Sequence, residues 1–97
     1  MYVILTSKPG QFHTDLDERL QQIEAYDYMF YGRKRAHFVI AKLEGEIKVR
    51  IVEETEHPAV NLVPSKFLPR FDTVEQAREE LRQLSHFGRM QASLVKC

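Results

Sequence analysis

The chain has one cysteine, no tryptophan, and only four glycines and four prolines among 97 residues. Its cysteine, Cys97, excludes a disulfide framework within one chain, which favours a reducing, cytoplasmic compartment. No apolar run approaches the roughly 20 residues that span a bilayer, so we expect no membrane contact. Cations and anions balance at 14 each, so no net field attracts polyanions. Glycine-rich phosphate loops and the G-x-S-x-G elbow are missing, and we therefore expect no enzyme and no bound cofactor.

What is present is the composition of an ordinary globular protein, with 43% hydrophobic and 29% charged residues. Ninety-seven residues suffice for one hydrophobic core and not for two, so residues 1–97 are predicted to form a single domain. The run "YVILT" is followed by Ser-Lys-Pro-Gly, which predicts a first strand over 2–6 rather than a signal peptide.

The middle of the chain predicts three antiparallel strands, over 26–31, 35–43 and 46–53. Within 35–43, the stretch "AHFVIA" at 36–41 is apolar on both faces, as in a central strand. Glu44-Gly45 supplies a tight connection to the next strand, so a meander is the economical arrangement.

The segment before these strands, residues 15–24, is predicted to be a short helix. Thr14 and Asp17 have the spacing of a capping box, and apolar residues at helical spacing follow at Leu16, Leu20 and Ile23. The apolar stripe is thin, and a structured loop fits this segment nearly as well.

The C-terminal third contains the clearest element. Residues 73–87 are predicted to form a helix, with Asp72 as N-cap, Gly88 at its end and one apolar stripe of Val74, Ala77, Leu81 and Leu84. Residues 90–96 alternate well enough to form a final strand. Before the helix, prolines at 58, 64 and 69 exclude a helix or a long central strand over 55–71. That segment is too apolar for a linker and must lie against the rest of the domain.

Together these elements predict an α+β fold. We expect a mostly antiparallel sheet of four or five strands, with one long C-terminal helix packed on one face. A ferredoxin-like arrangement is expected if residues 15–24 are helical.

The stretch "FYGRKRAHF" at 30–38 places Arg33, Lys34 and Arg35 in succession between aromatic residues. We predict a turn here, with Gly32 as the residue that tolerates positive φ. A solvated charged hairpin tip is one interpretation. The other is nucleic-acid contact, with phosphates on the cations and bases on the rings. The RNA-recognition consensus fits only in part, because its glycine and two aromatic positions are missing, which favours the charged turn.

Potential metal ligands occur at His13, Asp15 and Asp17. A helix beginning at Asp15 would not make these side chains converge, and acidic residues are common in a first helical turn. We therefore assign no metal site. His37, inside an apolar strand, is expected to be hydrogen-bonded and half-buried, and Cys97 is expected to be mobile.

The proline-rich segment offers a different kind of site. Phe67 and Leu68 are adjacent, so an extended chain cannot bury both against one face, and one of them is expected to project outward. A proline-flanked anchor loses less entropy on binding than a flexible one, and Lys66 and Arg70 would form its polar rim. The alternative is a lid that folds over the sheet.

The residues "VPSKFLPRFDT" at 63–73 and "VEQAREEL" at 74–81 resemble small bacterial proteins encoded among nitrogen-fixation genes, sometimes described as nitrogenase-associated factors. The resemblance covers most of the chain. It implies a cytoplasmic accessory role in assembling or maintaining a metalloenzyme, without the protein holding a cluster itself.

Three functions are thus ranked from the sequence. The first is a non-catalytic accessory or assembly factor that docks on a larger enzyme complex, such as nitrogenase. Its partner-binding residues are Lys66, Phe67, Leu68 and Arg70, with Arg33, Lys34 and Arg35 as a second basic contact. The second is a small nucleic-acid-binding module that uses residues 33–35. The third is an enzyme or metal binder.

Overall fold

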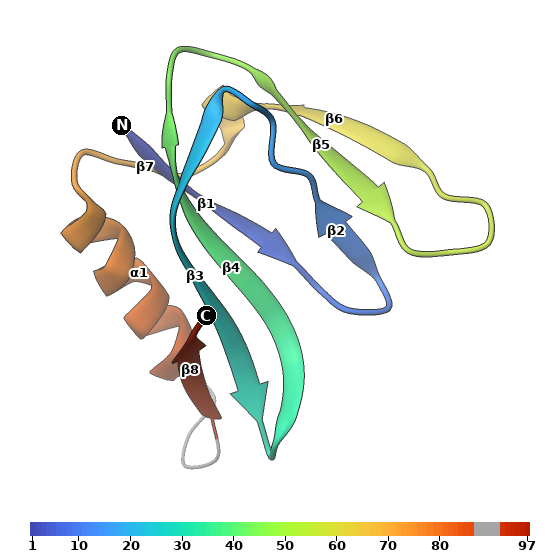
Figure 1. Ribbon diagram of the computed structural model, residues 1–97, viewed down its shortest axis with the longest axis vertical. Helices are drawn as coiled ribbons and strands as arrows, with labels where there is room; N and C mark the ends of the chain where they lie inside the picture. The colour runs from blue at the N-terminus through green and yellow to red at the C-terminus, as the bar shows by residue number, and fades with distance from the viewer. Residues whose placement is uncertain (87–91) are drawn as a thin grey trace.

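The computed structural model describes residues 1–86 and 92–97 and contains two antiparallel sheets and one α-helix (Figure 1). In chain order the elements are β1 (Tyr2–Ser7), β2 (Phe12–Thr14), β3 (Leu20–Phe30), β4 (Arg33–Leu43), β5 (Lys48–Glu53), β6 (Val60–Pro64), the 3₁₀ helix η1 (Ser65–Phe67), β7 (Arg70–Phe71), α1 (Val74–His86) and β8 (Ala92–Lys96). One sheet has the strand order β7-β1-β4-β3-β8, and the other has the order β2-β5-β6. The predicted α+β class with a mostly antiparallel five-stranded sheet is confirmed.

β3 and β4 form a long hairpin around a two-residue turn. Tyr31 and Gly32 both have positive φ, 52° and 72°, and Phe30 pairs with Arg33 across the turn. Two positive-φ residues are the requirement of a type I′ turn, whose twist matches that of the flanking strands. The predicted use of Gly32 in the turn is confirmed, whereas Arg33, Lys34 and Arg35 belong to β4 itself.

Two β-bulges interrupt the pairing of β3 with β4. The register shifts once between Tyr28 and Met29, which leaves Arg35 as the extra residue, and once between Gln22 and Glu24, which leaves Ile23 as the extra residue. Each bulge reverses the face on which the following side chains of the bulged strand point. The two faces of the sheet therefore carry different sets of residues from those that simple alternation predicts.

β4 is the central strand, and both of its faces are buried. On one face Ile40 packs with Ala77 and Leu81 of α1. On the opposite face Val39 and Ala41 belong to a second core, which the two sheets share through Val3, Leu5, Leu20, Ala25, Leu43, Ile47 and Val49. The five-stranded sheet thus lies between the helix and the three-stranded sheet (Figure 1).

The predicted meander is wrong at its third strand. β5 does not pair with β4 but with β2 and β6, in a separate sheet. The physical reason is that β1 and β3 already occupy both edges of β4. The segment after Gly45 (φ 74°) instead places Ile47 and Val49 against the face of the first sheet that does not carry α1.

The predicted helix over residues 15–24 is also wrong, since residues 20–30 form β3. Thr14 and Asp17 do not form a helical cap. The Thr14 hydroxyl donates to the carbonyl of Thr6 (2.5 Å), and Asp17 Oδ1 accepts the backbone N–H of Arg19 (2.9 Å), which closes a local turn before β3. The ferredoxin-like arrangement depended on this helix and is not confirmed.

α1 covers 13 described residues and begins one residue later than predicted, with its N-cap at Thr73 instead of Asp72. Thr73 Oγ1 accepts the backbone N–H of Gln76 (3.1 Å), as in a capping box, but the Gln76 side chain accepts the N–H of Asp72 (2.9 Å), one residue before the N-cap. Ala77 and Leu81 are buried as the stripe predicts, whereas Leu84 is exposed. The predicted helix end at 87–88 and the predicted strand start at residue 90 lie outside the described residues.

The proline-rich segment folds into β6, η1 and β7, with Ser65 as its anchor. Ser65 is buried, its N–H donates to the carbonyl of Ile47 (2.8 Å), and its hydroxyl accepts the N–H of Ile47 (3.0 Å). The segment therefore lies against the domain, as the sequence predicts. Within residues 1–86 and 92–97, no helix has the length and apolar character needed to cross a membrane.

A buried carboxylate joins the helix to the sheet. Glu24 of β3 accepts two hydrogen bonds from Arg78 of α1 (2.7 and 3.0 Å) and one from Tyr26 (3.1 Å), and it lies 3.0 Å from Lys96 Nζ of β8. The bonds from Arg78 are the main reason that the pKa of Glu24 falls to about 2, although burial opposes the shift.

This network predicts a specific acid sensitivity. Because the folded pKa of Glu24 lies below its ordinary value, its contribution to stability is complete above about pH 4.5 and is lost as the pH falls towards 2. Glu24→Gln should lower the free energy of unfolding by about 2 kcal/mol at pH 7, measured by urea denaturation. The difference from wild type should shrink between pH 4.5 and pH 2.

Glu75→Gln is the matched control, because Glu75 contacts the same arginine at 3.7 Å from an exposed position. It should change stability by less than about 0.5 kcal/mol. Equal effects of the two variants, or a Glu24→Gln effect that does not depend on pH, would contradict the assignment.

Candidate functional site

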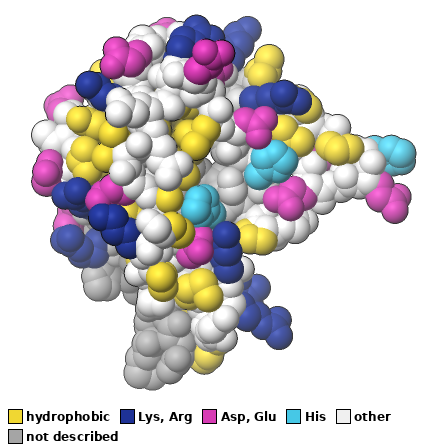
Figure 2. Space-filling view, viewed as in Figure 1, with side chains coloured by type: hydrophobic (Ala, Val, Ile, Leu, Met, Phe, Trp, Pro, Cys, Tyr) yellow, Lys and Arg dark blue, Asp and Glu magenta, His cyan; other side chains and the backbone are white. Residues whose placement is uncertain are grey.

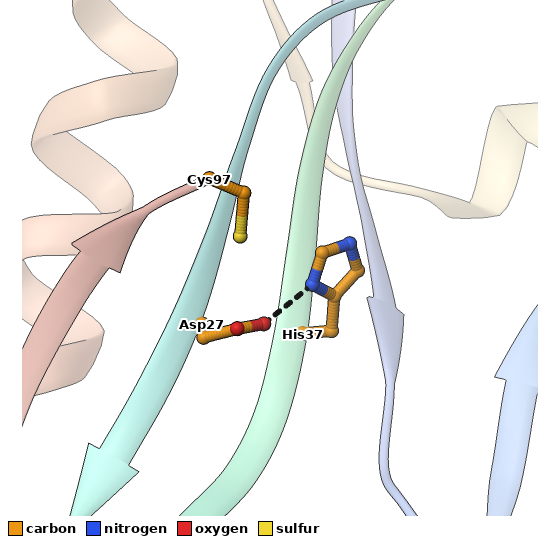
Figure 3. A group of neighbouring side chains, drawn as sticks. All are labelled: Asp27, His37 and Cys97. Carbon is orange, nitrogen blue, oxygen red and sulfur yellow. Dashed lines mark hydrogen bonds and ion pairs between the residues drawn. The ribbon is translucent and has the colours of Figure 1, made fainter.

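Three side chains with metal-binding or catalytic potential converge on the face of the five-stranded sheet that does not carry α1. Asp27 of β3 pairs directly with His37 of β4, and Cys97 follows β8 on the other side of β3. One donor atom of each residue lies within 4.8 Å of the other two. Figure 3 shows the three side chains turned towards one another. We call this group the Asp27–His37–Cys97 cluster.

Backbone pairing holds each member of the cluster in place. The N–H of Cys97 donates to the carbonyl of Ala25 (2.9 Å), so Cys97 extends the β3–β8 ladder. Cys97, expected to be mobile, thus has a defined backbone partner in the structure. His37 is half-buried and hydrogen-bonded, as predicted, with Nδ1 2.7 Å from Asp27 Oδ1.

The electrostatics of the cluster centre on Asp27. The hydrogen bond from His37, together with Lys34 Nζ at 3.2 Å, holds the pKa of Asp27 below its usual range, although burial opposes the shift. Burial raises the pKa of the Cys97 thiol, and the negative charge of Asp27 raises it further. A nucleophilic cysteine needs the opposite shift.

The orientation of His37 also argues against a nucleophile–base–orienter triad. In such a triad the imidazole turns one nitrogen to the nucleophile and the other to the carboxylate. Here the nitrogen that contacts Asp27 is also the one nearer to Cys97, and the other ring nitrogen lies on the far side of the ring (Figure 3). The geometry suits a shared cation between the three donors better than proton transfer from the thiol.

A second candidate site lies at the edge of the three-stranded sheet. β6 ends the sheet, and its outer edge pairs with no strand among the described residues. The N–H of Glu53 donates to Ala59 and that of Ser65 donates to Ile47. Glu53–Ala59 and Ile47–Ser65 are therefore hydrogen-bonded pairs of the ladder. Because bonded and non-bonded pairs alternate in an antiparallel ladder, the pair Arg50–Leu62, which lies three positions from each of them, is a non-bonded pair. The backbone N–H and C=O of Leu62 thus point away from β5.

Apolar side chains are exposed along this edge. Val60 is 47% exposed, Leu62 is 57% exposed and Phe67, just beyond the strand, is 70% exposed. The hairpin of β5 and β6 projects from the body of the domain, and hydrophobic side chains are visible along it (Figure 2). We call the surface formed by Val60, Leu62, Lys66 and Phe67 the β6 edge surface.

The predicted partner-binding residues of the proline-rich segment are divided by the structure. Phe67 projects outward with Lys66 Nζ 5.4 Å from its ring centroid, whereas Leu68 packs against the core. Arg70 lies in β7 and pairs with Glu46 at 3.4 Å. Lys66 and Phe67 thus belong to the exposed surface, and Leu68 and Arg70 serve the fold.

A shallow groove of about 600 Å³ is lined by Leu62, Pro64 and Ser65 together with charged residues, among them Lys66 of the β6 edge surface. Arg19, Lys48 and Lys66 line it with a single acid, Glu46, which already contacts Arg70. Neither Lys48 nor Lys66 has an acidic partner within 4 Å in the part of the chain that the structure describes. Arg19 lies 3.5 Å from Asp17, so Lys48 and Lys66 are the cations that give the groove its excess of positive charge.

The basic residues 33–35 lie at the opposite end of the five-stranded sheet from η1 (Figure 1). Their side chains do not form one patch, because Lys34 turns to Asp27 whereas Arg35 lines a pocket of about 460 Å³ with Tyr28 and Phe38. Lys8 lines the same pocket. The structure does not bring residues 33–35 together with the proline-rich segment.

His13, Asp15 and Asp17 are only partly brought together. His13 Nε2 lies 3.2 Å from Asp15 Oδ1, and Asp15 also faces Arg50 at 3.6 Å, whereas Asp17 bonds to Arg19. Among the described residues, the group whose donors converge is instead the Asp27–His37–Cys97 cluster.

Comparison of the chain with protein-family models, with curated proteins and with solved structures finds no match. The resemblance to nitrogenase-associated proteins therefore stays a prediction.

Sequence reasoning missed the cluster because its members are far apart in the chain. If the β3–β4 hairpin had no bulge, its two-residue turn at Tyr31-Gly32 would pair Asp27 with Ala36 and place the His37 side chain on the other face of the sheet. The bulge at Arg35 corrects this by one residue. No local sequence pattern predicts the bulge. The signal that the sequence did contain was the pair of ionisable residues Asp27 and His37 on either side of the predicted turn.

Proposed function

We propose that the protein is a non-catalytic accessory protein that docks on a larger protein through the β6 edge surface, where an extended, acidic segment of the partner adds a strand beside β6. The observation that carries this proposal is the combination of an unpaired strand edge with exposed apolar side chains. Native proteins normally protect such edges, and strand addition to an exposed edge is a recurring mode of peptide recognition.

Backbone geometry supports an added strand. Leu62 offers an N–H donor and a C=O acceptor that β5 does not use, and both are required for a ladder with a partner. Side chains alternate along the strand, so Val60 and Leu62 lie on the outer face together, away from the core that contains Val49. A partner strand would gain both hydrogen bonds and an apolar contact.

Charge supports an acidic partner segment. In the groove beside Leu62, Arg19 contacts Asp17 and Glu46 contacts Arg70, so the excess positive charge comes from Lys48 and Lys66, although the whole chain is neutral. Complementary charge steers association and suppresses wrong partners more than it adds affinity. The resemblance implies that the partner is a metalloenzyme such as nitrogenase or one of its assembly components, in a bacterial cytoplasm.

Phe67 is expected to be the apolar anchor of this contact. A partner can be identified by affinity purification of the native protein with mass spectrometry, then purified and titrated by calorimetry. Phe67→Ser should leave the thermal melt unchanged and weaken binding by about 2 kcal/mol, roughly 30-fold. Its neighbour provides the matched control, since Leu68 packs on the core and Leu68→Ser should lower stability by several kcal/mol. Unaltered affinity of Phe67→Ser would remove Phe67 from the interface.

A proline scan of β6 tests strand addition itself. Leu62→Pro removes an N–H that points away from β5, so the fold should survive, as it does with proline on edge strands. Binding should weaken beyond the effect of Leu62→Ala, which removes the side chain alone. Val63→Pro removes an N–H bonded to β5 and should lower the melting temperature instead. If Leu62→Pro and Leu62→Ala bind equally, the partner does not pair with β6. A dimer of the protein that Leu62→Pro dissociates would assign the edge to a second copy of this chain.

Nucleic-acid binding is the second candidate, and one observation favours it. Lys8 and Arg35 flank Tyr28 and Phe38 in the 460 Å³ pocket, a combination of cations and rings that suits a stacked base.

We expect no appreciable binding of RNA or single-stranded DNA at physiological salt, because residues 33–35 form no single basic patch. Fluorescence anisotropy across a salt series measures this. Affinity that falls linearly with salt on a logarithmic scale and is reduced by replacing Arg33, Lys34 and Arg35 with serine would reverse the ranking. Lys48→Ser with Lys66→Ser is the control, because it removes charge at the other end of the molecule.

A further inference from the structure

We propose that the Asp27–His37–Cys97 cluster binds a zinc ion. This goes beyond the proposed docking function, and it departs from the sequence-based assignment of no metal site. The cluster shares no residue with the β6 edge surface, so either proposal can fail without the other.

The donor set is the first support. A carboxylate oxygen, an imidazole nitrogen and a sulfur atom converge within 4.8 Å. Cysteine, histidine and acidic side chains are the ligands that proteins use for zinc. The mixture of a soft sulfur with harder nitrogen and oxygen donors favours zinc over magnesium or calcium, which prefer oxygen alone.

Preorganisation is the second support. The three residues are held by two neighbouring backbone ladders, with Asp27 of β3 directly opposite His37 of β4 and Cys97, after β8, bonded to Ala25, two residues before Asp27. Binding therefore requires adjustment of side chains and not of the backbone. In zinc sites the ligand atoms lie about 2.0–2.3 Å from the metal, and so about 3.3–3.6 Å from one another. The 2.7 Å contact between His37 Nδ1 and Asp27 Oδ1 has to open by less than about 1 Å for the metal to replace the shared proton.

Lys34 acts as an internal competitor. Its Nζ lies 3.2 Å from the same Asp27 oxygen that His37 contacts, and the side chain is 44% exposed. A zinc ion would displace this ammonium into solvent, at the cost of one exposed ion pair. Such a pair contributes little to stability, so the cost of displacing it is small.

Three protein donors leave one coordination position for water or for an atom of another molecule. Zinc sites with three protein ligands keep an open position, whereas structural sites are closed by four. The half-exposed donors make this an accessible, exchangeable site. The protein should fold without the metal, because both cores form independently of the cluster.

Calorimetric titration of reduced, chelator-treated protein with zinc tests the proposal, and cobalt serves as a spectroscopic probe. We expect one equivalent of zinc to bind and cobalt to give a thiolate-to-metal charge-transfer absorption that Cys97→Ser abolishes. His37→Gln, Asp27→Asn and Cys97→Ser should each weaken zinc binding at least about tenfold while thermal melts show a folded protein. Lys34→Gln should strengthen binding, because it removes the competing cation.

Three results would overturn the site. His13→Gln is the control, since His13 lies 3.2 Å from Asp15 and 3.9 Å from Glu54, and a larger loss there would move the metal to those residues. Binding that depends on Cys97 but not on His37, Asp27 or Lys34 would show only an adventitious thiol contact. No binding to the folded wild-type protein would end the proposal outright.

Discussion

The burial of β4 on both faces is the constraint on which the rest of the structure depends. Ile40 is fully buried against the helix, and Ala41, the next residue, is fully buried against the second sheet. Successive side chains of a strand point to opposite faces, so a strand with this pattern requires a layer on each side. α1 supplies one layer, and β5 supplies the other because both edges of β4 are already paired. The separate three-stranded sheet follows from this arrangement.

The two bulges decide what each face presents. The bulge at Ile23 allows Glu24 to lie on the helix face of the sheet, where Arg78 and Lys96 compensate its charge. It also allows Leu20, on the other side of the bulge, to lie in the core on the opposite face. The bulge at Arg35 places His37 opposite Asp27. Bulges are common beside functional sites because they re-aim side chains without breaking the sheet. In this protein one bulge serves stability and the other assembles the candidate metal site.

Both candidate sites occur where the strand ladders are incomplete. The cluster lies where β8 extends past its last paired residue to Cys97, and the β6 edge surface lies on a strand that has one neighbour only. The formal net charge of the chain is zero, yet its charged side chains are distributed unevenly between these two sites. The Asp27 carboxylate, contacted by His37 and Lys34, organises one site, whereas Lys48 and Lys66 give the other an excess of positive charge. A neutral protein can therefore offer both a cation site and a surface for an acidic partner.

The sequence by itself determined the α+β class, the first strand, the β3–β4 hairpin with Gly32 in its turn, and α1 with its buried Ala77 and Leu81. These features depend on local periodicity, turn chemistry and caps, which a short window of residues contains. It also predicted that one of Phe67 and Leu68 would face outward, although the geometry differs from the expected extended chain, because Phe67 ends the 3₁₀ helix η1 and only Leu68 is extended.

Only the tertiary structure decided the strand pairing of β5, the extended conformation of residues 20–24, the open edge of β6 and the convergence of Asp27, His37 and Cys97. The helical spacing of Leu16, Leu20 and Ile23 was misleading, because only Leu20 is buried and a turn at Asp17 replaces the expected cap. Strand partners and bulge positions minimise the exposed apolar area and the unpaired backbone groups of the whole domain. That balance is set by contacts between residues distant in sequence, and no local pattern encodes it.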